Sequence, residues 1–220
     1  MSKIKILRSD NDYMKLAQFV INENYSHHRK INQFSEPKTE ALYNEELLYR
    51  NHSTVYALQD DNSDFIGTIR VLKWNYRDIL PIEKIFSINP LHILEDGFQS
   101  DVWHIGRFAI RKNEGLLPLK KLMTLAIGKV CENNGNIAFA ECDTKLLNIL
   151  FLMGIEPKII GKSKYYLGSE TIPVLLTYEN LLRFYNKNEH LVIGYKEHLS
   201  PQNQTNNIIF KYINTNYSFV

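Results

Sequence analysis

The sequence contains few of the residues and patterns by which proteins build disulfide frameworks or metal sites. Two cysteines occur among 220 residues, Cys131 and Cys142, and they form no CxxC pair. Two separate thiols in a chain of this length are typical of buried free cysteines. No HExxH motif or Cys/His spacing accompanies the seven histidines, so we expect no metal site.

Long apolar runs and a strong net charge are also lacking. No stretch approaches the roughly 18 apolar residues of a membrane span, and the first ten residues return to charge too soon for a secretion signal. Lysine and arginine number 26 against 24 acidic residues, and a net charge of +2 is too small for a general nucleic-acid binder. The composition, 44% hydrophobic and 23% charged, therefore predicts a globular cytoplasmic protein.

Periodic patterns fill most of the chain and predict a mixed α/β fold. We expect strands at residues 3–8, 54–59, 65–74, 101–110, 136–142, 156–168 and 171–178, and helices at residues 10–21, 37–51, 116–133, 143–154 and 181–185. The polar segment DDNSD at residues 60–64 predicts a hairpin turn. The two strand–helix units within residues 101–154 predict parallel strands covered by helices.

The two ends of the chain differ in composition. Residues 1–185 carry the regular patterns and are expected to form one domain, whereas residues 186–220 are rich in asparagine and are expected to form an extension. Within that extension, residues 207–213 are the one β-like run. Residues 75–100 are irregular, and a connection of this length is more often functional than idle.

Several short segments resemble a known group of acyltransferases. GTIRV at residues 67–71 resembles the G-x-x-R-[LV] segment of acyl-homoserine-lactone synthases and of the long-chain N-acyl amino acid synthases, and WHIGRFA at residues 103–109 resembles their W-E-x-S-R-F-A segment. Closing segments resemble those of the N-acyl amino acid branch: LMGIEP at 152–157, YYLG at 165–168 and IPVLL at 172–176. The likeness covers about residues 10–180 and implies a GNAT-like fold, with a central mixed, splayed β-sheet flanked by helices.

The resemblance implies a function and its reactants. It implies an N-acyltransferase that moves a fatty acyl group from a phosphopantetheine thioester to the amine of an amino acid or similar small amine. The expected donor is acyl carrier protein, with acyl-coenzyme A as the alternative, and no metal or redox cofactor is needed. Homoserine-lactone synthesis is the neighbouring enzymatic alternative. A catalytically silent domain that binds an acyl chain or a carrier protein is the alternative outside the enzyme class.

The resemblance also places the reacting groups on two neighbouring strands. Splaying of the central strand exposes residues 106–110, where Phe108 and Ala109 are candidates for the amides that hold the oxyanion. His104 stands where the family usually has glutamate and is the first candidate for the base, with Glu141 in reserve. Each of these two side chains equally fits a structural role, and His104 shares a face with Arg107 only if the strand is bulged.

Further residues are candidates for binding the substrates. Arg70 and Arg107 resemble the paired arginines of the family, which fork onto a carboxylate of the substrate or of the protein itself. Aromatic side chains are candidates for the acyl lining, although core packing is the default for them: Trp103, Phe108, Phe139 and Phe151. Tyr165 or Tyr166 is a candidate for protonating the leaving thiolate.

The segment after the central strand departs from ordinary GNAT enzymes. Residues 111–120 lack the R-x-x-G-x-G/A loop, whose backbone amides bind the pyrophosphate of coenzyme A. A carrier protein presents the same thioester without the nucleotide. Four basic residues are therefore candidates for contacting its acidic surface, and they equally fit ordinary solvated charges: Arg111, Lys112, Lys120 and Lys121.

Overall fold

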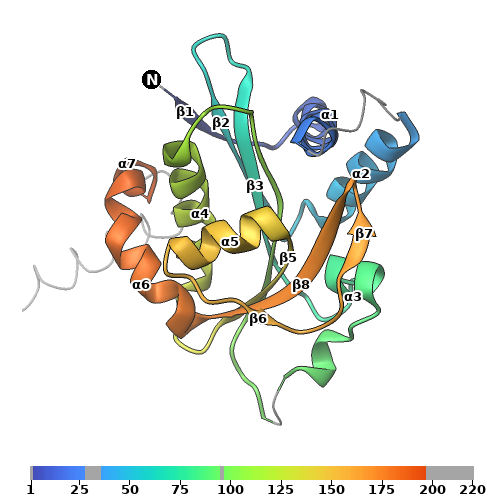
Figure 1. Cartoon of the computed structure of the whole chain (residues 1–220), viewed down its shortest axis with the longest axis vertical. Helices are drawn as coiled ribbons and strands as arrows, with labels where there is room; N and C mark the ends of the chain where they lie inside the picture. Colours follow the sequence, from blue (N-terminus) through green and yellow to red (C-terminus); the bar gives the residue numbers. More distant parts are fainter. Residues whose placement is uncertain (1, 28–35, 95–96, 197–220) are drawn as a thin grey trace, which may run out of the picture.

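A computed structural model describes residues 2–27, 36–94 and 97–196, which form one mixed sheet covered by helices on both faces (Figure 1). The strands are β1 (Lys3–Ile6), β2 (Ser53–Gln59), β3 (Phe65–Lys73), β4 (Val102–Ile110), β5 (Ile137–Asp143), β6 (Lys158–Ile159), β7 (Lys164–Tyr166) and β8 (Ser169–Thr177). Their order across the sheet is β1-β2-β3-β4-β5-β8-β6, with β7 also paired to β8. Only β4 and β5 pair in parallel among these neighbours.

The helices lie in two layers. The helical elements are α1 (Asp10–His27), α2 (Glu36–Tyr49), α3 (Pro81–Phe86), α4 (Leu116–Val130), α5 (Thr144–Leu152), α6 (Tyr178–Asn188) and α7 (Ile193–Lys196), with short 3-10 turns η1 (Pro90–His92) and η2 (Glu189–Val192). In Figure 1, α1 to α3 lie on one side of the sheet and α4 to α7 on the other. No helix among the described residues is long and apolar enough to cross a membrane.

Local signals in the sequence explain several boundaries. The side chain of Asp143 caps α5 by accepting the N–H of Leu146 at 2.6 Å. Gly154 follows that helix with a φ of +78°, a conformation that glycine adopts without strain. In the hairpin turn, Asp60 accepts the N–H groups of Asn62 and Asp64, each at 3.0 Å. The predicted mixed sheet flanked by helices is confirmed.

Three segments differ from the expectations. The stretch expected to form one strand over residues 156–168 contains the short strands β6 and β7, and both pair with β8. The irregular connection at residues 75–100 includes α3 and η1. The helix expected over residues 181–185 runs from Tyr178 to Asn188, because the side chain of Thr177 supplies its N-cap.

The predicted boundary after residue 185 falls inside α6. Beyond it, Asn188 and Val192 are buried, and the hydroxyl of Tyr195 donates to the carbonyl of Ile4 and accepts its N–H. The packed part of the chain therefore continues past residue 185, because these side chains cover the core and the edge of β1. The β-like run at residues 207–213 lies outside the described residues.

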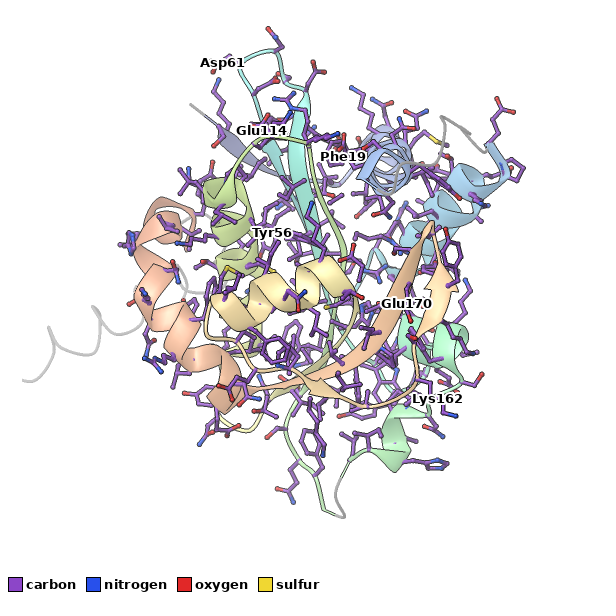
Figure 2. All side chains as sticks on the ribbon, in the orientation of Figure 1. Phe19, Tyr56, Asp61, Glu114, Lys162 and Glu170 are labelled. Atoms are coloured by element: carbon purple, nitrogen blue, oxygen red, sulfur yellow. The ribbon has the colours of Figure 1, made fainter. Side chains whose placement is uncertain are left out.

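The two faces of the sheet have different cores. The face under α4, α5 and α6 forms one large apolar cluster that includes Tyr56, Ile105 and Leu122. Figure 2 shows Tyr56 in the interior between the sheet and α4. The opposite face forms two smaller apolar clusters, one under α1 and one under α3. Between these two clusters the central strands carry buried charged side chains.

Candidate active site

The two central parallel strands separate halfway along their length. Pairing between β4 and β5 ends with Ile105 opposite Ala140. Beyond this pair β4 continues to Ile110 and β5 to Asp143, each bonded only to its other neighbour, β3 or β8. The sequence placed the opening at residues 106–110, and the structure has it there.

A bulge in β4 lies at the point of separation. The register to β3 shifts by one residue between Arg70, opposite Gly106, and Thr68, opposite Ala109. Within this bulge Arg107 has a φ of +53°, and its carbonyl accepts the hydroxyl of Thr68 at 2.9 Å. The extra residue turns the side chain of Arg107 to the face that also carries His104. The sequence analysis allowed this shared face only if the strand was bulged, and the bulge is present.

A cavity of about 390 Å³ occupies the gap between the separated strands. On the α1 side it is lined by Val20, Glu23 and Asn24 of α1 and by Tyr166, Leu167, Ser169 and Thr171 of the β7–β8 hairpin; on the other side it is lined mainly by apolar residues of α4 and α5, namely Leu116, Leu119, Met123, Leu146, Ile149 and Leu150. Glu141 lines the cavity from β5. The cavity therefore connects a polar half with an apolar half through the sheet.

Glu141 is held in place by a buried histidine. Both carboxylate oxygens of Glu141 lie 2.9–3.0 Å from Nε2 of His104, whose side chain is only 1% exposed. On its other side, Nδ1 of His104 lies 3.3 Å from an Nη of Arg70. A guanidinium can only donate, so we assign Nδ1 as the acceptor and Nε2–H as the donor to Glu141. In this tautomer His104 is neutral and has no lone pair left for a substrate proton.

The two arginines of the resemblance are committed to internal ion pairs. Arg70, which is fully buried, donates to Glu46 at 2.6 Å, and Arg107 donates to the same oxygen of Glu46 at 2.6 Å and also to Glu45. Burial alone raises the pKa of Glu45, but the charges of Arg107 and Lys84 outweigh it and lower the pKa to about 2. Of the two interpretations, these contacts match the one in which the arginines bind carboxylates of the protein itself.

Three participants in this network were missed by the sequence reasoning. Glu45 and Glu46 occupy consecutive positions of an ordinary-looking helix, and no sequence signal marks them as buried. Gly106 is the third: a Cβ there would lie 2.7 Å from the His104 ring and 3.5 Å from Arg70. Glycine is needed at position 106 because the ring and the guanidinium approach this backbone closely. Its place inside the matched WHIGRFA segment was the one available signal.

The tyrosine that lines the cavity is Tyr166. Burial raises the pKa of its phenol, and the nearby Arg107 opposes that rise only in part. Tyr165 is 63% exposed, donates to the carbonyl of Gly168 at 2.7 Å and does not line the cavity. Alternation along β7 explains the difference, since neighbouring side chains point to opposite faces. Of the two candidates, the structure brings Tyr166 to the site, which corrects the placement of Tyr165.

Of the four aromatic residues expected to line the acyl site, Phe108 lines the cavity and the other three lie elsewhere. Trp103 packs in the cluster under α4, and Phe139 is fully buried in the cluster under α3. Phe151 is 47% exposed on the outer side of α5. None of these three lines the cavity, so the structure corrects this expectation. Aliphatic side chains of α4 and α5 form the apolar wall, because the gap between the strands faces those two helices.

The two candidate amides of β4 differ in direction. Beyond the bulge, the N–H of Arg111 donates to the carbonyl of Ile66 in β3 at 2.7 Å. Amides alternate in direction along an antiparallel strand, so Ala109, which pairs with Thr68, also directs its N–H toward β3. The Ala109 amide is therefore turned away from the gap. Phe108, which lines the cavity, therefore stays the candidate for the amide that holds the oxyanion.

The four basic candidates fall into two groups. Arg111 bonds to Asp60 at 2.9 Å and to Glu114 at 2.6 Å, so its charge is already balanced. Lys112 is exposed on the loop before α4, and Lys120 and Lys121 are half-buried on α4. None of these three lysines forms an ion pair with another described residue.

Comparison with solved structures identifies the fold. The N-acyl amino acid synthase FeeM from uncultured soil microbes superimposes with a TM-score of 0.61 at 14% identity, over 86% of this chain and 98% of FeeM. The coenzyme A-dependent acyl-homoserine lactone synthase BjaI gives 0.54 at 11%, over 86% and 90%. A putative GNAT acetyltransferase from Desulfovibrio desulfuricans gives 0.52 at 12%, over 81% and 99%.

Sequence comparisons give no such match. A scan of protein-family profiles found no match, and a search of curated protein sequences found none either. The backbone therefore carries the likeness: a mixed sheet whose central parallel strands separate around a cavity. This chain has the GNAT fold, in the form shared with N-acyl amino acid and acyl-homoserine-lactone synthases.

Proposed function

We propose that the chain is an N-acyltransferase that transfers a fatty acyl group from the phosphopantetheine thioester of an acyl carrier protein to the amine of an amino acid or similar small amine. One observation carries the proposal: Glu141, supported by His104, lines a cavity that passes between separated parallel strands. The fold shared with two acyltransferases of this kind supports it. Cytoplasmic location is part of the same proposal.

The two halves of the cavity suit the two substrates. The apolar half between α4 and α5 suits an acyl chain, because burying each methylene there contributes about 0.8 kcal/mol. The polar half between α1 and the β7–β8 hairpin suits a small amine. Attack across the gap then forms the C–N bond of the amide and breaks the C–S bond of the thioester.

Proton transfer is assigned to Glu141. Its carboxylate takes the proton of the attacking amine, while the His104 Nε2–H orients that carboxylate. The N–H of Phe108 stabilises the oxyanion. Tyr166 keeps its proton at neutral pH because its pKa is raised, and it donates this proton to the departing thiolate. His104 is thus a positioning residue, and the direct role expected for it passes to Glu141.

The primary test is product formation by the purified chain. Acyl carrier protein and coenzyme A thioesters of one chain length are offered with a panel of amines, and amides are detected by mass spectrometry. We expect Glu141→Gln to lower turnover by roughly 10²–10⁴-fold. The control is Glu170→Gln, because Glu170 is exposed on β8, does not line the cavity and accepts the hydroxyl of Ser163 at 2.6 Å (Figure 2). A folded protein that forms no amide with any pair would refute the proposal in favour of a silent binding domain.

The role of His104 is tested by two substitutions. His104→Gln keeps an N–H donor for Glu141 and is expected to retain most activity. His104→Leu removes the donor that orients Glu141, so turnover should fall further than in His104→Gln. If His104 were itself the base, both substitutions would lower turnover equally.

The carrier-protein donor is tested by ionic strength. The free lysines Lys112, Lys120 and Lys121 lie on the loop before α4 and on α4 itself. Affinity for acyl carrier protein should fall as salt rises, since the screening length is about 8 Å at physiological ionic strength. Replacing all three lysines with glutamine should flatten that dependence. Turnover with acyl-coenzyme A that greatly exceeds turnover with acyl carrier protein would contradict this choice of donor.

A further inference from the structure

A three-residue ion cluster lies at the end of the cavity that is lined by Arg111 and Glu114, which we call the cavity mouth. Arg111, at the end of β4, bonds to Asp60 of the β2–β3 turn at 2.9 Å and to Glu114 of the following loop at 2.6 Å. Arg111 and Glu114 both line the cavity. Figure 2 shows Asp61, the neighbour of Asp60, and Glu114 at the same end of the molecule. The cluster ties the hairpin turn to the loop that leads into α4.

The helices that begin at this mouth offer little to a phosphate group. Helix N-termini generally bind anions through free N–H groups and the helix dipole. Here Pro118 removes one N–H from the first turn of α4, and the carboxylate of Glu114 precedes that turn. At α5, the carboxylate of Asp143 already accepts the N–H of Leu146. Both positive helix ends at the mouth are therefore next to a carboxylate.

We propose that Glu114 and Asp60 determine the donor specificity of this chain by holding Arg111 in a cluster of net negative charge that excludes the nucleotide diphosphate of coenzyme A from the cavity mouth. The inference rests on the proposed function and specifies its donor. A diphosphate placed beside this cluster meets two carboxylates and a guanidinium that is already paired with both, although Lys145 of α5 also lines the cavity. The phosphopantetheine of a carrier protein brings a single phosphodiester and no nucleotide, so it meets less repulsion.

The experiment removes the two carboxylates and leaves the guanidinium of Arg111 in place. Glu114→Gln leaves Arg111 paired with Asp60, and Asp60→Asn keeps an oxygen for the turn amides of Asn62 and Asp64. The double variant therefore frees the charge of Arg111 without dismantling the turn. Glu132→Gln is the matched control, because Glu132 pairs with Lys129 beyond the other end of α4 at 2.7 Å.

The first measurement is the binding of coenzyme A alone, by calorimetry, which requires no turnover. We expect about threefold tighter binding for Glu114→Gln, about tenfold for the double variant and no change for Glu132→Gln. Adding Arg111→Ala to the double variant should abolish the gain. Unchanged binding in the double variant, with melting temperature preserved, would overturn the inference, and so would a gain that survives Arg111→Ala.

The second measurement compares acyl-pantetheine with acyl-coenzyme A as donors carrying the same acyl chain. The ratio of kcat/KM should shift toward acyl-coenzyme A in the double variant, while turnover of acyl-pantetheine stays within about twofold. If the wild type turned over neither donor while the double variant still bound coenzyme A more tightly, the proposed function would be refuted and the exclusion of coenzyme A by the cluster would stand. Turnover with an unchanged donor ratio would refute the inference alone.

Discussion

The two faces of the central strands bury different kinds of side chain. Toward α4 the strands present apolar side chains, such as Ile105 and Val71, that pack against Leu122. Toward α2 the same strands present Arg70, His104 and Arg107, which are buried among carboxylates. The apolar face gains stability from contact area, whereas the groups of the charged face are buried in ion pairs with one another. The strand gap with its cavity lies between them.

The charged face should be the more sensitive to loss of one member. Arg70→Ala leaves Glu46 with one cation fewer and removes the donor to His104, so we expect a loss of about 3–5 kcal/mol in the free energy of unfolding. Urea unfolding measures it. Arg50→Ala is the control, because Arg50 pairs with Asp10 at the surface at 3.1 Å and should cost less than about 1 kcal/mol. Equal losses in both variants would mean that burial does not distinguish the two pairs.

The apolar face should lose stability through a cavity and independently of pH. Leu122 is fully buried under the sheet, so Leu122→Ala should lower the free energy of unfolding by about 3 kcal/mol at both pH 7 and pH 3. Leu152→Ala provides the exposed counterpart, since Leu152 is 88% exposed on α5. We expect it to change stability by less than about 0.5 kcal/mol.

Acid should weaken the charged face selectively. The pKa of Glu45 is lowered to about 2 from 4.5, so its ionised form stabilises the fold above pH 4.5, and this contribution is lost as pH falls toward 2. Between pH 7 and pH 3 the wild type should lose about 2 kcal/mol more than Glu45→Gln does. Urea unfolding at the two pH values gives the difference. Parallel pH dependence in both proteins would contradict the assignment.

The smallest effect is expected where the network reaches the solvent. The side chain of Lys84 is 61% exposed and binds Glu45 at 2.8 Å. Lys84→Met should therefore lower the free energy of unfolding by less than about 1 kcal/mol, and added salt should reduce the difference. A loss as large as that of Arg70→Ala would show that the network depends on its exposed end.

Elements with strong local signals were predicted well. The hairpin around residues 60–64 and the cap at Asp143 depend on contacts within a few residues, so the sequence specifies them directly. The segment at residues 156–168 was harder, because its two short strands form only by pairing with β8. The same holds for α6, whose full length is fixed by packing beyond residue 185.

In the site, too, local features were predicted from the sequence, and features that depend on distant contacts were not. Motif spacing placed His104, Arg107 and Phe108 on one strand and Glu141 on the next. Spacing alone gave no means to decide which of His104 and Glu141 faces the cavity, because that depends on where two strands stop pairing. Nor did it reveal Glu45 and Glu46, since their burial results from the docking of α2 against β3 and β4.

The sequence by itself indicated most of the strands and helices, because periodicity and turn chemistry act over short distances, and its resemblance to acyltransferases supplied the candidate site residues. The tertiary structure decided which of those residues meet. A one-residue bulge at Arg107 brought its side chain to the face of His104, and pairing with Asp60 and Glu114 neutralised Arg111. These outcomes depend on contacts between residues far apart in the chain, and only packing brings such residues together.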